Sequence, residues 1–119
     1  MIKSYLFLMR SYPHGGIRVQ ETLDMILTAA AMDRSVSLLF LDEGVFQLLH
    51  GQAPEALGCK HIAPIFQALP IYDVESFWIE AESLEERGVA QRQLILPAKS
   101  IARDDVARLI ENHDIVVSC

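Results

Sequence analysis

The sequence predicts a single α/β domain, spanning residues 1–119, in which a mainly parallel sheet of about five strands lies between two layers of helices. Three observations predict this three-layer α/β/α sandwich. Apolar runs of strand length alternate with helical segments along the whole chain. The first of these runs is apolar at nearly every position, as in a strand buried on both faces. The length of 119 residues suits one domain with one core.

The first third of the chain predicts a strand, a loop and a helix. Residues 2–9 form a nearly continuous apolar run, which predicts a strand inside a parallel sheet. Residues 10–17 predict a loop, because proline and glycine interrupt them. Residues 18–32 predict an amphipathic helix, because apolar side chains recur at every third or fourth position. These side chains are Val19, Leu23, Ile26, Leu27 and Ala30.

The middle of the chain predicts a second strand and short helical pieces. Residues 36–41 predict the strand, which ends at the polar turn 42–44. Residues 45–49 predict a short helical turn. Residues 61–69 predict a further helical stretch, which ends at Pro70 because proline cannot continue a helix.

Residues 77–81 predict the third strand, followed by a helix with signals at both ends. Ser83 and Glu86 have the spacing of a capping box, in which the serine hydroxyl satisfies an early backbone N–H and the glutamate reaches back. Gly88 predicts a left-handed residue that ends this helix.

The last third predicts a short strand over 94–96, a helix over 101–112 and a fifth strand over 115–117. Strands and helices that alternate in this way predict right-handed crossovers between parallel strands. In such sheets, functional residues lie at the carboxyl ends of the strands. The loops expected there are 10–17, 42–50, 80–83 and 97–100.

Charge and composition exclude several classes of function. The net charge of −6 and the scattered lysines and arginines argue against direct binding of nucleic acid, which needs a basic stripe. The apolar runs are far shorter than the roughly 20 residues of a membrane-spanning helix. No signal peptide is evident, so we expect a cytoplasmic protein with free thiols at Cys59 and Cys119. The mean hydropathy of +0.24 fits a sheet buried on both faces, a partner surface, or both.

Motifs for metals and cofactors are weak. His14 and its glycines could form a phosphate-binding turn, but no nucleotide motif surrounds them. Asp42 and Glu43 could bind a metal or act as acid and base, or they could form a solvated turn. The four histidines, at 14, 50, 61 and 113, lack the spacing of metal ligands. We therefore expect no metal and no cofactor.

Cysteines and aromatic residues leave several alternatives open. Lys60 and His61 would favour a thiolate at Cys59, which could then carry sulfur or simply fill space in a loop. Cys119 lies beside the terminal carboxylate, which raises a thiol pKa. Adjacent strand residues face opposite sides of a sheet, so Phe77 and Trp78 cannot share a face, and either both pack in the core or one meets a partner. The apolar cluster of Phe46, Leu48 and Leu49 could be buried or could anchor a partner.

Several segments resemble the DsrE/DsrF/DsrH family, most closely its F-type branch, which includes the TusC proteins. The most specific segment is Leu-Leu-Phe-Leu-Asp-Glu-Gly-Val-Phe-Gln-Leu-Leu-His-Gly-Gln at 38–52. Pro-His-Gly at 13–15, Ser-Leu-Glu-Glu-Arg-Gly at 83–88 and Asp-Ile-Val-Val at 114–117 support it, and the similarity covers essentially the whole chain. The resemblance implies a flavodoxin-like fold and a hetero-oligomer.

The resemblance also implies partners. In this family, E-type (TusD-like) and H-type (TusB-like) sibling subunits join the F-type subunit in a dimer of trimers. The complex passes persulfide sulfur to a carrier of the TusE/DsrC type, for 2-thiolation of the tRNA wobble uridine or for intracellular sulfur oxidation. In isolation the chain could form a homo-oligomer, because its partner surface would need cover.

The expected relay cysteine is missing from this chain. In the E-type sibling it ends the third strand, eight residues before the glycine that closes the next helix, and here that position is Glu80. The H-type cysteine lies in the first helix, and residues 18–32 contain none. We therefore expect a subunit without its own catalytic residue. The alternatives are an independent sulfur carrier that uses Cys59 and a flavodoxin-like module that binds a small cofactor. The residues expected to contact partners are His14, Glu43, Phe46, Leu49 and Glu80.

Overall fold

A parallel sheet forms the centre of the molecule. The computed structural model describes residues 3–10, 17–32, 34–48, 69, 74, 76–91, 94 and 98–118. Within them, five parallel strands have the order β4-β3-β2-β1-β5. The strands are β1 (Ser4–Met9), β2 (Ser35–Phe40), β3 (Ser76–Glu80), β4 (Lys99–Ile101) and β5 (Ile115–Ser118). The predicted parallel α/β sheet is confirmed.

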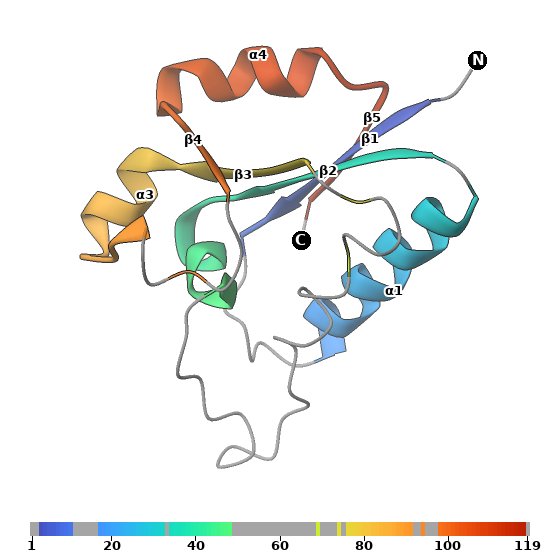
Figure 1. Cartoon of the computed structure of the whole chain (residues 1–119), viewed down its shortest axis with the longest axis horizontal. Coiled ribbons are helices and arrows are strands. Elements are labelled where there is room, and N and C mark those ends of the chain that lie inside the picture. Colours follow the sequence, from blue (N-terminus) through green and yellow to red (C-terminus); the bar gives the residue numbers. More distant parts are fainter. Residues whose placement is uncertain are drawn as a thin grey trace.

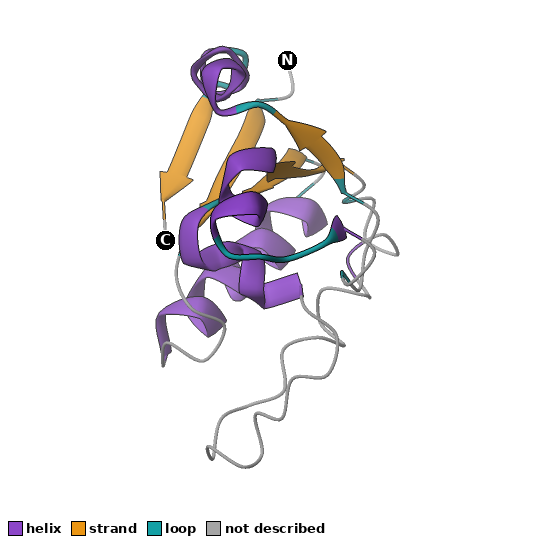
Figure 2. Cartoon of the chain, turned by 90° about the vertical axis from the view of Figure 1, so that its left-hand side faces the viewer, coloured by secondary structure: helices purple, strands orange, loops and turns teal. Residues whose placement is uncertain are grey.

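Helices cover both faces of the sheet. Helix α1 (Ile17–Ala31) lies on one face and α4 (Val106–Glu111) on the other, as Figure 1 shows. Figure 2 shows the same layers from the side. Three short helical segments follow strand ends: the 3-10 helix η1 (Asp42–Leu48), α3 (Ala81–Glu86) and the 3-10 turn η5 (Arg103–Asp105). The three-layer α/β/α architecture is therefore as the sequence predicts.

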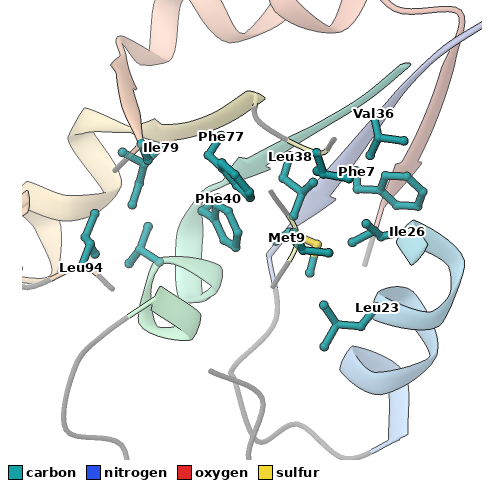
Figure 3. Close-up of a cluster of buried hydrophobic side chains, with 14 of the residues drawn as sticks. Phe7, Met9, Leu23, Ile26, Val36, Leu38, Phe40, Phe77, Ile79 and Leu94 are labelled. Atoms are coloured by element: carbon teal, nitrogen blue, oxygen red, sulfur yellow. The ribbon is translucent and has the colours of Figure 1, made fainter. Parts of the chain in front are cut away.

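The larger core fills the space between the sheet and α1. Its side chains come from alternate positions of β1, β2 and β3, because successive residues of a strand face opposite sides. Leu23 and Ile26 of α1 lie against them in Figure 3. The sheet residues of this core are Phe7, Met9, Val36, Leu38, Phe40, Phe77 and Ile79. Burying each large apolar side chain contributes about 1.5–3 kcal/mol relative to its exposure.

A smaller core lies under α4. It consists of Leu6, Leu8, Leu39 and Leu41, with Trp78, Ile101, Val106, Leu109 and Ile110 packed around it. The two adjacent aromatic residues of β3 therefore divide between the two cores, as expected from strand geometry. Trp78 is only partly buried, and the Lys99 Nζ atom lies 5.5 Å from its ring centroid. This cation therefore lies over part of the ring, while the ring itself packs against the smaller core.

The fourth strand lies later than predicted. The sheet includes Lys99–Ile101, whereas the apolar run at 94–96 contributes, within the described residues, only Leu94, which is buried and forms a single bridge. The strand was missed because an edge strand needs little apolar sequence: Lys99 and Ser100 are exposed. As a result, Lys99 and Ser100 of the expected loop at 97–100 belong to β4, and the carboxyl end of this strand leads to η5.

The predicted capping box does not form. Helix α3 begins at Ala81 with Glu80 as its N-cap residue, so Ser83 lies inside the helix. Its hydroxyl donates to the Glu80 side chain and accepts from the Asp42 backbone N–H, and α3 follows β3 without a loop. Gly88 has a φ of +66°, which confirms the predicted left-handed residue after the helix.

The last helix is shorter than the predicted range 101–112. Ile101 belongs to β4 and 103–105 form the 3-10 turn, so α4 starts only at Val106. The predicted helix at 61–69 lies outside the described residues except for the buried Leu69. The prediction for loop 10–17 likewise falls outside them apart from its two ends.

Candidate functional site

Charged side chains from three strand ends meet at the carboxyl edge of the sheet. Asp42 and Glu43 follow β2, Glu80 ends β3, and Arg103 follows β4. These strands are neighbours and run in the same direction, so their carboxyl ends lie together. Two further residues lie beside them: Ser83 in α3 and Arg87 directly after this helix. We call these six residues and Glu86 the edge network.

Glu80 is the buried centre of the edge network. Its side chain is only 4% exposed. The Ser83 hydroxyl donates to Oε1 at 2.5 Å, and Arg103 donates to the same oxygen from Nε at 3.1 Å and from Nη2 at 2.9 Å. A buried carboxylate is strongly unfavourable unless it is paired and hydrogen-bonded. The neighbours of Glu80 meet both conditions.

Arg103 follows β4 and connects the end of this strand to α3. Its Nη1 and Nη2 atoms donate to the two carboxylate oxygens of Glu86 at 3.1 and 2.8 Å. Its backbone N–H donates to the carboxylate of Glu82 at 2.9 and 3.0 Å. The Arg103 guanidinium holds the pKa of Glu86 below its usual range. In turn, hydrogen bonds to Glu86 and then Glu80 raise the pKa of Arg103 above its ordinary value, so the guanidinium stays charged.

The turn after β2 is tightly fitted against β1. Asp42 has a φ of +51°, a conformation rare outside glycine, and its backbone N–H donates to the Ser83 hydroxyl at 2.9 Å. A Cβ atom on Gly44 would lie 1.6 Å from the Met9 carbonyl oxygen, so only glycine fits there. The serine hydroxyl therefore accepts from the β2 turn and donates to Glu80, which connects two strand ends through one fully buried side chain.

Asp42 and Glu43 have separate arginine partners. Arg10 Nη2 lies 3.0 Å from Asp42 Oδ2, and Arg87 Nη2 lies 3.3 Å from Glu43 Oε1. Arg87 also donates to the Ser83 carbonyl oxygen at 3.3 Å. The two carboxylates thus do not converge on one point. Among the residues that the structure describes, no group of three potential metal ligands forms.

The edge network can hold the strand ends in place and present charge to solvent. Within the described residues it contains carboxylates, guanidinium groups and one buried hydroxyl, and no thiol. A carboxylate can accept hydrogen bonds but cannot form a persulfide, which needs a cysteine sulfur. The outer part of the network, at Arg103 and Glu86, is about half exposed, with side-chain exposures of 45% and 52%.

The predicted site residues meet different outcomes. Glu43 and Glu80 lie at the same edge, bridged by Ser83 and Arg87, and Phe46 lies half-buried in η1. The predictions for His14, Leu49, Cys59 and Cys119 fall outside the described residues. Their contact with partners stays a prediction.

Sequence reasoning missed the two residues that organise the site. Ser83 was assigned to a helix cap, and Arg103 was placed within the last helix. The signal that could have found Arg103 is its position two residues after β4, but that strand was itself displaced in the prediction. The signal for Ser83 is its spacing of three residues from a glutamate that ends a strand.

A model of the DsrE/DsrF-like family matches residues 3–119. The chain belongs to the DsrE/DsrF-like family. Its relatives span similar lengths. The intracellular sulfur oxidation protein DsrF of Allochromatium vinosum is 36% identical over 98% of this chain and 82% of its own length. A TusC homolog of Pseudomonas aeruginosa is 36% identical over 99% of both chains, and the TusC protein of Escherichia coli is 33% identical over 98% of both.

A solved structure supports the same fold for this DsrE/DsrF-like chain. The crystal structure of the YchN protein from Escherichia coli superposes with a TM-score of 0.83 at 16% identity, over 99% of this chain and 100% of that one. At this identity the likeness bears on the fold alone. Among the described residues, no helix has both the length and the apolar character needed to cross a membrane.

Proposed function

We propose that this chain is the F-type, non-catalytic subunit of a sulfur-relay complex. One observation carries the proposal: the carboxyl end of β3, where the family resemblance places the relay cysteine of the E-type sibling, is occupied by Glu80. The names of the relatives, TusC and DsrF, connect the family to sulfur transfer and sulfur oxidation. A subunit with glutamate at this position would shape the complex and leave the transfer to its siblings.

The bonding of Glu80 supports a structural role. Its carboxylate oxygen already receives three hydrogen bonds, from Ser83 and Arg103. Among the described residues, the Glu80 carboxylate at this strand end is therefore engaged in internal contacts, as expected of a buried polar group with a structural role. Glu80 would affect a partner indirectly. Its ion-pair partner Arg103 also pairs with Glu86, and both of these side chains are partly exposed.

The partners we propose are an E-type and an H-type sibling in a dimer of trimers, in the cytoplasm. The complex would hand persulfide sulfur to a TusE/DsrC-type carrier, either for tRNA wobble-uridine 2-thiolation or for intracellular sulfur oxidation. Glu43 is 40% exposed at the carboxyl edge, and Phe46 lies close to it in η1, so both are suitably placed for a sibling contact. We propose His14 and Leu49 for the same surface from their sequence positions.

The test is reconstitution of sulfur transfer with cysteine-free versions of this chain. The chain is co-expressed with its two siblings, and persulfide on the carrier is measured by mass spectrometry. We expect the Cys59→Ser/Cys119→Ser variant to support transfer as well as the native chain, because the relay thiol lies in a sibling.

A matched control removes the cysteine that ends the third strand of the E-type sibling, which should abolish transfer while the complex still assembles in native mass spectrometry. Loss of transfer with an intact complex in the cysteine-free variant would contradict the proposal and favour Cys59 as a carrier. Failure to recover any sibling, with a small molecule bound instead, would contradict it in favour of a cofactor-binding module.

A further inference from the structure

An apolar pocket opens between α1 and the edge of the sheet. It has a volume of about 340 Å³, and its walls come from α1, β1 and β5. Tyr5, Phe7 and Val117 form the sheet side of the pocket. Met25 of α1 and Met32, directly after the end of α1, line it too, yet they are 49% and 60% exposed. Strand β5 is the edge strand of the sheet on this side, and Figure 1 shows α1 below the sheet.

The two exposed methionines are placed symmetrically about one point on α1. Met25 and Met32 are seven positions apart, or about two helical turns, so they lie on one side of the helix. Their midpoint falls between Thr28 and Ala29, and both of these residues also line the pocket. In an antiparallel pair of α1 helices with a two-fold axis at this midpoint, each Met25 would oppose Met32 of the second copy.

Two residues of opposite charge, Asp24 and Arg34, also line the pocket. Asp24 lies in α1, and Arg34 lies three residues after the helix ends at Ala31. In the antiparallel pair, Asp24 of each copy would lie opposite the carboxyl end of the other α1, close to Arg34 of that copy. Neither side chain has an ion-pair partner in the part of the chain that the structure describes. Opposite charges at matching positions fix the register of an interface and disfavour other partners.

We propose that two copies of this chain associate through α1, antiparallel about a two-fold axis near Thr28 and Ala29. Met25 and Met32 fill the pocket of the opposite copy, and two Asp24–Arg34 pairs flank the contact. Flexible methionine side chains suit such a contact because they adapt to irregular apolar surfaces. The inference rests on the α1 face alone and does not depend on the sulfur-relay role.

Charge exchange is the first test. The full-length chain is studied by sedimentation equilibrium over a wide range of concentration. We expect a dimer, and we expect Asp24→Arg or Arg34→Asp alone to raise its dissociation constant by roughly tenfold or more, because each change creates two like-charge contacts. The double variant D24R/R34D should restore most of the affinity. Asp104→Arg and Arg108→Asp are matched controls on the opposite side of the sheet, and they should leave the dimer unchanged.

Crosslinking tests the position of the axis. In a Cys59→Ser/Cys119→Ser background, Thr28→Cys lies at the proposed axis, where its two copies would face each other and form a disulfide on mild oxidation. Asp104→Cys is the control and should not crosslink. A monomer at all concentrations would overturn the proposal. So would a dimer that neither single charge change weakens, or native mass spectra in which a monomer retains a small molecule that Met32→Glu displaces.

Discussion

The carboxyl edge of the sheet and the α1 face beside β5 differ in how far their side chains find partners within the chain. At the edge, a buried carboxylate is surrounded by partners from its own chain, and three strand ends are connected through Ser83 and Arg103. On the α1 face, methionines are exposed around an open apolar pocket, and Asp24 and Arg34 lack ion-pair partners among the described residues. One region is complete within a single chain, and the other is not.

This difference indicates where specificity comes from. A saturated polar network stabilises one arrangement of its own strands, because any unpaired buried group would be costly. An open apolar face gains free energy only when another surface covers it. Substitutions in the edge network should therefore act on the folding of the single chain. Those on the exposed side of α1 should act on association.

The largest effect is expected at the turn after β2. Gly44→Ala places a methyl group against the Met9 carbonyl, and backbone cannot move aside as a side chain can. We expect a loss of at least about 3 kcal/mol in the free energy of unfolding, measured by urea denaturation. Gly88→Ala is the matched control: its Cβ meets nothing within 4 Å, and only its positive φ opposes the change, at about 1 kcal/mol. Equal losses at both positions would contradict the tight fit.

Neighbouring residues of α1 should differ sharply. Ile26→Ala removes a fully buried side chain from the larger core and should cost about 3 kcal/mol. Met25→Ala removes an exposed one and should change the free energy of unfolding by less than about 0.5 kcal/mol. Denaturation at low protein concentration measures both without a contribution from association. A large loss for Met25→Ala under these conditions would show that its side of α1 belongs to the folded core.

Removing the centre of the edge network should have an intermediate effect. Glu80→Ala removes the acceptor of the Ser83 hydroxyl. It also leaves Glu86 as the carboxylate paired with the Arg103 guanidinium. Because Arg103 is partly solvated, we expect a loss of about 2 kcal/mol, smaller than for a fully buried pair. Urea denaturation of Glu80→Gln, which keeps the size of the side chain, should show a smaller loss. If Glu80→Ala is as stable as the native chain, the network is not the stabilising feature described above.

The smallest effect is expected at the opposite edge, where Asp114 binds the start of β1. The Ser4 backbone N–H donates to its carboxylate at 2.8 Å, with a second bond from the hydroxyl, and these bonds lower the pKa of Asp114. A carboxyl whose folded pKa is depressed adds stability above its unfolded value near 3.9, and this is lost as pH falls through the folded pKa. Asp114→Asn should therefore lower the melting temperature at pH 7 and have less effect at pH 3.

The control for this pH dependence is Asp104→Asn. Asp104 is exposed, and its side chain has no hydrogen bond or ion pair in the described part of the chain. The difference in melting temperature between this variant and the native chain should be small at both pH values. If Asp114→Asn behaves in the same way, the bonds to Ser4 do not stabilise the folded state.

The strands in the middle of the sheet were predictable because their burial dictates their composition. Phe7, Leu38 and Phe40 lie in segments whose residues are apolar on both faces of the strand. Few structures other than a strand inside a parallel sheet bury such a short segment on both faces. Strand β4 was not predictable by this means, since exposed Lys99 and Ser100 place no apolar demand on the sequence. Local pattern therefore identifies a strand where its sequence is apolar, as in the central strands and in residues 115–117 of β5, and misses one whose residues are polar and exposed.

The edge network was largely invisible in the sequence for a related reason. Ser83 and Glu80 are close in the chain, but Arg103 is 23 residues away from Glu80. Their contact depends on β3 and β4 being neighbours, which is a property of the sheet and not of either segment. Glu80 was singled out only because the family resemblance identified its position. Its burial and its partners required the three-dimensional arrangement.

The pairing of β1 with β5 has a consequence for synthesis of the protein. Ser4 and Asp114 are 110 residues apart, yet they bond to each other, and β1 lies between β2 and β5. During translation, β1 leaves the ribosome first of these strands and β5 leaves last. Strand β1 cannot pair with β5 until then. The backbone groups on that edge of an apolar strand therefore stay unpaired through almost the whole of elongation. Chains that stall late in translation would expose that edge, and chaperones that shield extended apolar segments would have their longest period of contact there.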